Sequence, residues 1–199
     1  MAEPSRYSTD GNIENGVLKN KGNIIDQARL ENIETLLYSD TYTHFLDLAA
    51  SKNPPFNAKF IFEIHRYFLS TLYEWAGKTR TVELSKGTTM FCAARFIDNA
   101  LKEFDKLIQK HLPTKDDTKK LLSEKLAIIH CEFNAIHPFR EGNGRTIRLF
   151  LDLLTNSIGY SVIDYSKSSV TSYINACIAG MQQDYKKMES IIYKGLSKK

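Results

Sequence analysis

The sequence predicts an all-α fold, a single helical domain that carries one small β-hairpin. Three observations predict it. Apolar residues recur at helical spacing through most of the chain after residue 23. Capping residues or prolines stand at the ends of these stretches, and only residues 79–91 show the texture of a hairpin. The chain has 199 residues, of which 42% are hydrophobic, enough to bury the core of one domain.

The first residues of the chain differ from the rest. Residues 1–23 are polar and rich in glycine, asparagine and aspartate, which predicts an irregular arm lying on the domain. Residues 24–199 are expected to form that domain, because they contain no repeat and no linker.

The helices begin after Asp26, a candidate N-cap. Two groups of apolar residues follow at roughly helical spacing, and we expect the second group to form a second helix that ends before Pro54. Asn57 opens another helix, whose apolar face continues to Trp75. The side chains of this helix that are expected in the core are Phe60, Ile64, His65, Tyr67, Phe68, Thr71 and Leu72.

Residues 79–91 predict a hairpin. Residues 79–84 are β-prone and alternate, residues 85–88 suit a turn, and residues 89–91 are expected to return as the second strand. A lone two-stranded hairpin is marginally stable in water, so it either packs on the helices or stays available for a partner. An ordinary surface hairpin is the alternative.

Two helices precede the most informative stretch of the chain. The first has an apolar face that starts at Phe96 and closes at residues 111–113. The second follows a capping candidate at residues 116–118, and its apolar residues step by four and three to Ile136. This second helix is expected to be buried, and it delivers His137 to its own end.

Further helices are expected beyond that stretch. Residues 149–154 are apolar nearly all round, as expected of a central helix, and residues 156–159 end it. Residues 166–192 again show helical spacing.

Composition argues against several classes of function. The net charge of +4 is modest and the charges are interleaved, so nucleic-acid binding gains little support. No targeting segment and no run of about 18 apolar residues is visible, so we expect no membrane span and a cytoplasmic protein, with delivery into a host cell left open. Motifs of P-loop enzymes and dinucleotide binders are absent. The three cysteines are isolated and expected to be reduced thiols: Cys92, Cys131 and Cys177.

The stretch at residues 137–148 concentrates reactive side chains. It reads HPFREGNGRTIR and supplies an imidazole, a carboxylate, a Gly-Asn-Gly turn and two arginines. The turn leads into a predicted helix, so unpaired N–H groups at that helix N-terminus would form an anion site. Arg145 and Arg148 lie three residues apart and would project from one face of the helix onto phosphate oxygens.

Two residues of this stretch suit chemistry rather than phosphate binding alone. Glu141 is placed to hold Mg²⁺, which usually takes one or two protein carboxylates and keeps water and phosphate oxygens as its other ligands. His137 has an ordinary pKa near about 6.5 and suits removal of a proton from an attacking hydroxyl. Each residue alone has a plain structural interpretation, as a helix-end histidine, a turn or a solvated face. Their combination favours phosphate chemistry.

The stretch resembles the signature of the Fic domain family, His-x-Phe-x-Asp/Glu-Gly-Asn-Gly/Lys-Arg-x-x-Arg, at every specified position. Residues 16–21, GVLKNK, resemble the entry segment of many Fic proteins. Residues 64–66 with residues 73–80 are similar to the helix that leads to the family's target-binding flap. The resemblance covers about the whole chain and implies a Fic-like helical bundle whose hairpin is the flap.

The resemblance implies AMPylation, the transfer of AMP from ATP to a Tyr, Thr or Ser hydroxyl of a target protein. It makes His137 the general base, Glu141 the Mg²⁺ ligand and Phe139 a structural anchor. The segment near Asn175 would line the adenine pocket. The implied anion cradle and phosphate ligands are Gly142, Asn143, Gly144, Arg145 and Arg148. The flap would bind the target by strand addition through Lys86, Gly87, Thr88, Thr89 and Met90.

The resemblance also bears on control. Many Fic proteins carry an inhibitory helix, Ser/Thr-x-x-x-Glu-Gly/Asn, whose Glu pairs with the second Arg of the signature. No stretch here fits fully, and the nearest, residues 10–15, lacks the hydroxyl residue and lies among glycines that disfavour a helix. We therefore expect a small antitoxin-like protein that caps Arg148 in trans, or no such control. A toxin, an effector and a housekeeping modifier remain alternatives.

Two other functions use the same fold. A phosphotransferase of the Doc type, or a phosphocholine-transferring relative, would move another phosphate-containing group. The Doc motif has Lys at the position of Gly144, which argues against it. A non-catalytic, ATP-gated binding module needs neither a base nor a metal ligand, so His137 and Glu141 argue against that alternative.

Overall fold

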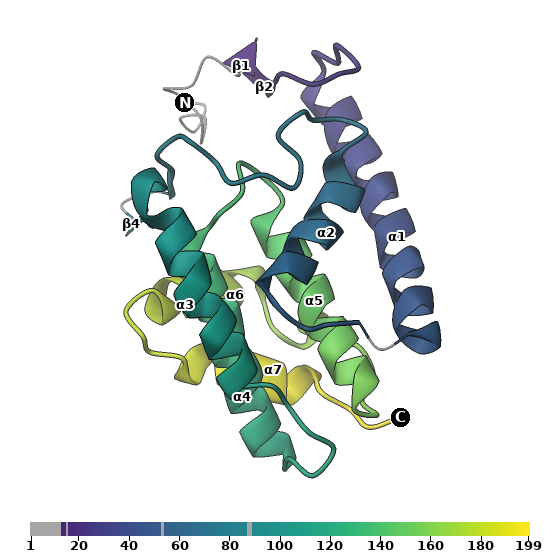
Figure 1. Ribbon diagram of the computed structural model, residues 1–199, viewed down its shortest axis with the longest axis vertical. Helices are drawn as coiled ribbons and strands as arrows, with labels where there is room; N and C mark the ends of the chain where they lie inside the picture. Colours follow the sequence, from purple (N-terminus) through teal and green to yellow (C-terminus); the bar gives the residue numbers. More distant parts are fainter. Residues whose placement is uncertain (1–12, 15, 53, 87–88) are drawn as a thin grey trace.

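The computed structural model describes residues 13–14, 16–52, 54–86 and 89–199, and its described part is mostly helical (Figure 1). The helices are α1 (Gln27–Ser51), α2 (Ala58–Leu69), α3 (Ile97–Lys110), α4 (Lys119–Ile136), α5 (Asn143–Ser157), α6 (Val170–Gly180) and α7 (Lys186–Gly195). The short strands are β1 (Ile13–Glu14), β2 (Val17–Leu18), β3 (Ser85–Lys86) and β4 (Thr89–Met90). The all-α prediction is confirmed.

Helices α4 and α5 form the centre of the bundle (Figure 1). Helix α5 packs against α1, α2 and α4, while α4 also contacts α3, α6 and α7. The predicted core face of α4 is buried throughout, including Phe133 with no exposed surface and Ile136 at its end. The loop between α4 and α5 therefore starts and ends in the rigid core.

The helix starts follow the capping residues that the sequence indicated. The side chain of Asp26 accepts a hydrogen bond from the Arg29 amide at 2.7 Å and begins α1. Asn57 and Thr118 cap α2 and α4 in the same way. Each bond satisfies one N–H group that a helix start leaves without an intrahelical partner.

Helix α1 corrects the prediction of two helices, because it continues unbroken for 25 residues. Its middle is rich in Ser, Thr and Asp, which weaken helices by competing for backbone groups. The Thr41 hydroxyl instead donates back to the Leu37 carbonyl at 2.6 Å, and the Thr43 hydroxyl donates to the Ser39 carbonyl. Packing of α1 on α2 and α5 outweighs this weak local preference.

Two side chains expected in the core are exposed. Helix α2 ends at Leu69, so Thr71 lies in the following turn and faces solvent. Tyr67 is 40% exposed and stacks on the His44 ring of α1, with ring centroids 4.2 Å apart. The prediction for Tyr67 was wrong because its ring packs across the outer surface of α1 and α2 rather than between them.

The second strand of the hairpin forms where predicted, but the first strand begins later in the chain than predicted. Strand β3 pairs with β4, with Ser85 opposite Met90 and Lys86 opposite Thr89. Residues 79–84 were expected to be the first strand, yet the Arg80 amide donates to the Pro138 carbonyl of the α4–α5 loop at 2.8 Å, and the pairing with the second strand starts at Leu84, whose carbonyl accepts from the Phe91 amide. We call residues 79–91 the flap. Gly87 and Thr88 lie outside the described residues.

The arm expected to be irregular contains a second short hairpin, in which β1 pairs with β2. Val17 and Leu18 are buried in a smaller apolar cluster with Leu30 and Phe68. Most of residues 10–15, the nearest match to an inhibitory helix, lie outside the described part, and Ile13–Glu14 is a strand. Within the described ranges, no helix is long and apolar enough to cross a membrane.

Close packing of α6 on α4 generates a test. A Cβ atom added to Gly180 would lie 2.7 Å from the Cβ of Cys131, which is fully buried on α4. Gly180→Ala is therefore expected to lower the unfolding free energy by about 1–3 kcal/mol in urea denaturation. Thr171→Ala, on the exposed side of the same helix, is the control and should change it by less than about 0.5 kcal/mol. Equal stability of the two variants would contradict the close contact.

Candidate active site

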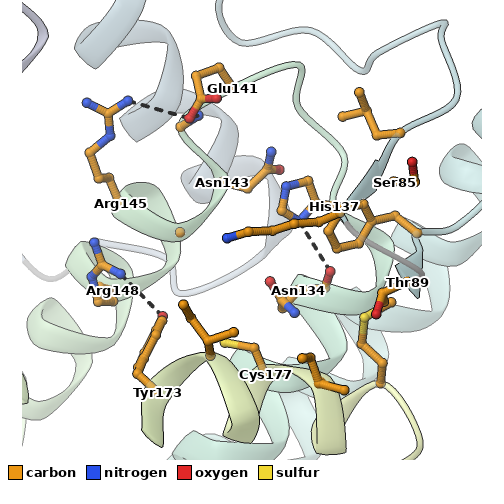
Figure 2. Close-up of a pocket in the computed structure, with 18 of the residues that line it drawn as sticks. Ser85, Thr89, Asn134, His137, Glu141, Asn143, Arg145, Arg148, Tyr173 and Cys177 are labelled. Atoms are coloured by element: carbon orange, nitrogen blue, oxygen red, sulfur yellow. Dashed lines mark hydrogen bonds and ion pairs between the residues drawn. The ribbon is translucent and has the colours of Figure 1, made fainter. Parts of the chain in front are cut away.

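A pocket of about 540 Å³ opens beside the α4–α5 loop (Figure 2). Its walls are the end of α4, the N-terminus of α5, the flap and one side of α6. The reactive residues of the 137–148 stretch that line it are His137, Glu141, Gly142, Asn143, Gly144, Arg145 and Arg148. The fold therefore brings the predicted site residues of this stretch together.

His137 ends α4 in a left-handed conformation, with φ of 49°. Its Nδ1 lies 3.3 Å from the Asn134 carbonyl, and its ring stacks on Phe91 at 3.8 Å between centroids. Since a carbonyl only accepts, Nδ1 carries the proton and Nε2 is left as the basic nitrogen. Burial lowers the pKa of His137 to about 4, which Glu141 opposes. The imidazole is therefore neutral at pH 7 and able to accept a proton.

The loop after His137 is closed by Asn143. Its side-chain oxygen accepts from the Phe139 amide at 2.9 Å, and its side-chain nitrogen donates to the Phe139 carbonyl at 2.8 Å. Phe139 is fully buried, which agrees with its expected role as an anchor. The Asn143 side chain is thus used within the loop, so its contribution to an anion cradle is its backbone N–H.

His65 of α2 holds the α4–α5 loop through hydrogen bonds and ring stacking. The Gly77 amide donates to its Nδ1 at 2.8 Å, so Nε2 carries the proton and donates to the Glu141 carbonyl at 2.9 Å. The ring also stacks on Phe139 with centroids 3.7 Å apart. The sequence correctly placed His65 in the core. It gave no sign of these bonds, because their partners lie 12 and 76 residues away.

The N-terminus of α5 faces the pocket with free backbone donors. Gly142 takes φ of 81°, and a Cβ atom there would lie 3.0 Å from the Leu69 side chain, so only glycine fits without strain. The first intrahelical bond runs from the Thr146 amide to the Gly142 carbonyl. The amides of residues 143–145 precede it and are available to an anion.

The two arginines of the stretch are held by different elements. Arg148 donates to the Tyr173 hydroxyl of α6 at 3.3 Å, and no carboxylate lies within ion-pair distance of it in the described part of the chain. Arg145 instead pairs with Glu34 of α1 at 2.5 Å and lies 3.6 Å from Glu141. Both line the pocket, but of the two only Arg145 pairs with a carboxylate among the described residues.

Two partners of these arginines were missed by sequence reasoning. Glu34 is only 6% exposed and accepts a hydrogen bond from the Tyr73 hydroxyl at 2.6 Å. The Tyr173 hydroxyl lies 2.7 Å from Nε2 of His130, which is buried. The available sequence signal for Glu34 was an acidic residue among the apolar positions of the α1 segment, whereas Tyr173 had no such signal.

Helix α6 and the flap complete the walls. Asn175 itself is exposed and does not line the pocket, but its neighbours do: Tyr173, Ile174, Cys177, Ile178 and Met181. From the flap, Ser85, Lys86 and Thr89 reach the pocket, whereas the Met90 side chain is 68% exposed. The pocket therefore has a charged end at α5 and an apolar side at α6.

The chain matches a known family and several curated proteins. The model of the Fic/DOC family matches residues 55–155. A probable protein adenylyltransferase, y4lH of Sinorhizobium fredii, is 34% identical over 169 residues, covering 84% of this chain and 85% of that protein. Protein adenylyltransferase VbhT of Bartonella schoenbuchensis is 32% identical over 92% of this chain, which spans 38% of VbhT.

Solved structures share the fold. BepC of Bartonella tribocorum, determined with AMPPNP bound, superposes with a TM-score of 0.76 over 92% of this chain and 93% of that one, at 24% identity. The Fic domain of a Bartonella quintana effector with bound ADP gives 0.75 over 98% and 95%, at 22% identity. At these identities the likeness establishes the fold alone.

Burial of His65 generates a pH prediction. Burial lowers its pKa to about 4, below the ordinary 6.5, so the unfolded chain binds the proton first as the pH falls. The unfolding free energy contributed by this group is then lost from about pH 6.5 downwards, by about 2 kcal/mol at pH 5. Between pH 7 and 5, the native chain should lose about that much more stability than His65→Gln.

Urea unfolding at both pH values measures this difference. His44→Gln is the matched control, because His44 is exposed on α1. That control should keep the pH dependence of the native chain. An equal loss of stability in the native chain and in His65→Gln would contradict a neutral, buried His65.

Proposed function

The chain belongs to the Fic/DOC family, and on that premise we propose that it is a protein adenylyltransferase that transfers AMP from ATP to a hydroxyl side chain of a target protein. One observation carries the proposal. A neutral histidine and the open N-terminus of a helix face one pocket, so a base and an anion site lie side by side. Residues 24–199 would be the catalytic domain.

The relatives support this assignment. The Sinorhizobium and Bartonella proteins are named as protein adenylyltransferases, and the BepC structure holds the ATP analogue AMPPNP. The chain spans most of the first relative but well under half of VbhT. The shared length includes the whole 137–148 stretch, which the family model also covers.

His137 would act as the general base. Its Nε2 takes the proton of the target hydroxyl as that oxygen attacks the α-phosphorus of ATP. The new bond joins the oxygen to phosphorus, the bond to the β-phosphate breaks, and pyrophosphate leaves. The pKa of about 4 keeps Nε2 unprotonated at neutral pH. Such proton transfer typically contributes about 10² to 10⁴-fold.

The phosphates would bind at the N-terminus of α5. The amides of residues 143–145 and the helix dipole favour negative charge there. Arg148 is the stronger candidate for a direct phosphate contact, because its charge is not neutralised by a carboxylate in the described part. Arg145 is neutralised by Glu34, so we assign it a second role, holding Glu141 in place at 3.6 Å.

Glu141 would hold Mg²⁺. Its carboxylate lines the pocket beside the α5 N-terminus and is partly exposed, which fits a cation that takes one protein ligand and several phosphate or water oxygens. Bound there, Mg²⁺ would neutralise phosphate charge that develops as the bond to the leaving group breaks.

The remaining walls suggest where the other parts of the substrates lie. The apolar side of α6, with Ile174, Ile178 and Met181, suits the adenine ring. The flap strands β3 and β4, with Lys86, Thr89 and Met90, suit an extended target segment added as a further strand. Gly87 and Thr88 are assigned to the same role from the sequence alone.

Control would come from outside this chain. An inhibitory carboxylate would pair with Arg148, and no such residue pairs with it in the described ranges. We therefore propose a small antitoxin-like protein that supplies this carboxylate in trans.

Labelling with α-³²P-ATP, Mg²⁺ and cell lysate tests the function directly. The native chain should label protein bands, whereas His137→Ala should lose transfer while ATP still binds, because the base takes no part in holding phosphate. Arg148→Ala should lose both, and Arg95→Ala, at an exposed arginine that does not line the pocket, should behave as the native chain. Label from γ-³²P-ATP alone would indicate a phosphotransferase, and no label from either a binding module. Retained transfer by His137→Ala would contradict the assigned base.

The two glycines of the turn give a sharper test of the anion site. A Cβ at Gly144 would meet only Arg148, at 3.6 Å, so Gly144→Ala should fold normally. Its methyl group would keep phosphate from the α5 amides and raise the ATP dissociation constant about tenfold, measured by calorimetry. Gly142→Ala is the contrasting variant, because its strain should lower the melting temperature. Native ATP affinity in Gly144→Ala would contradict the site.

A further inference from the structure

Arg80 lies buried at the point where the flap meets the α4–α5 loop. Its side chain is only 5% exposed, and its guanidinium donates to four backbone carbonyls. Nε lies 2.8 Å from the His137 carbonyl, and one terminal nitrogen lies 2.6 Å from that of Val82. The other terminal nitrogen reaches the carbonyls of Cys92 and Ile136. One side chain thus joins the first leg of the flap and Cys92, the residue after the flap, to the end of α4.

Backbone hydrogen bonds also join this region to the end of α4 and the loop that follows it. The Arg80 amide donates to the Pro138 carbonyl at 2.8 Å, and the Cys92 amide donates to the Ala135 carbonyl at 3.0 Å. Phe91, next to Cys92, stacks on the His137 ring. The base of the flap is therefore attached to the residues that set the position of His137.

The conformation of His137 needs such support. It is left-handed, which is unfavourable for a residue with a side chain. The last carbonyls of a helix also lack intrahelical partners, and those of Ile136 and His137 would be left unpaired by the turn. Arg80 donates to both, so it caps the C-terminus of α4.

Only an arginine meets this geometry. Its planar guanidinium presents donors in a fixed fork, whereas lysine offers one flexible nitrogen. No carboxylate lies within ion-pair distance of Arg80 in the described part. Glu83, whose charge acts on Arg80, accepts a hydrogen bond from the Ala94 amide through its carboxylate. Burying a cation that is held by carbonyls alone costs free energy. That cost fits a role for Arg80 in holding these carbonyls in place.

We propose that Arg80 is the positioning residue for His137, fixing both the backbone of the base and the flap that presents the target hydroxyl to it. This inference rests on the proposed role of His137. On this inference, Arg80 acts on the base and the flap and not on the phosphate site. In the described part of the chain, Arg80 bonds to the flap, to Cys92 just after it, to the end of α4 and, through its amide, to Pro138. The phosphate groups are assigned to α5, so ATP binding should not depend on Arg80.

The test compares Arg80→Lys with the native chain and with Arg95→Lys, the matched control on the exposed side of the segment that follows the flap. We expect Arg80→Lys to lower kcat for labelled transfer about 100-fold, because small misplacement of a reacting group costs about that much. The KM and the dissociation constant for ATP should stay within about twofold. Arg95→Lys should match the native chain in all three.

A second measurement reports on His137 itself. Nitrogen NMR of the imidazole, assigned by comparison with His137→Ala, should show the Nδ1–H tautomer in the native chain, as its bond to Asn134 requires. In Arg80→Lys we expect a mixture of both tautomers, because the turn that aims Nδ1 at this carbonyl is released. A residue with a merely structural role would leave the tautomer unchanged.

The outcomes are distinct. A native kcat or a native tautomer in a folded Arg80→Lys overturns the inference, as does a loss of ATP affinity equal to the loss of kcat. If Arg80→Lys does not fold, Arg80→Gln is measured in its place, and failure of both to fold also overturns it. If the native chain transfers no label, the proposed function fails, whereas the tautomer and ATP-binding comparisons still decide the role of Arg80.

Discussion

The site depends on the paired hydrogen bonds between the Asn143 side chain and the backbone of Phe139. They close the loop on itself, so the end of α4 and the start of α5 keep a fixed separation. His65 fixes the same loop to α2 through the Glu141 carbonyl and the stacked Phe139 ring. A base on one helix and an anion site on the next thus become parts of one rigid unit.

This arrangement requires polar groups in the core. His65, His130 and Arg80 are almost fully buried, and each is held by hydrogen bonds to backbone or to a neighbouring side chain. Burial keeps the histidines neutral, since it lowers the pKa of His65 to about 4 and that of His130 to about 3. Neutral imidazoles have fixed donor and acceptor nitrogens, so they can hold a loop in one conformation.

The two arginines of α5 differ in the side chains that contact them. Arg145 and Arg148 lie three apart on α5, yet the first is neutralised by Glu34 on α1 while the second meets the Tyr173 hydroxyl on α6. A cation already paired with a buried carboxylate gains less from a phosphate than one that is not. The difference between their proposed roles follows from which helices pack on either side of α5.

The sequence by itself determined the all-α class, most helix starts and the identity of the pocket residues at positions 137–148. These are signals that act within a few residues, such as a cap, a step of three or four, or a turn with two glycines. It did not reveal the unbroken α1, the late start of the first flap strand or the exposure of Tyr67, where packing outweighs local preference. The bonds of His65 to Glu141, Glu34 to Arg145 and Arg80 to His137 span 76, 111 and 57 residues. Only the tertiary structure decided these, because contacts between distant segments leave no periodic pattern in the chain.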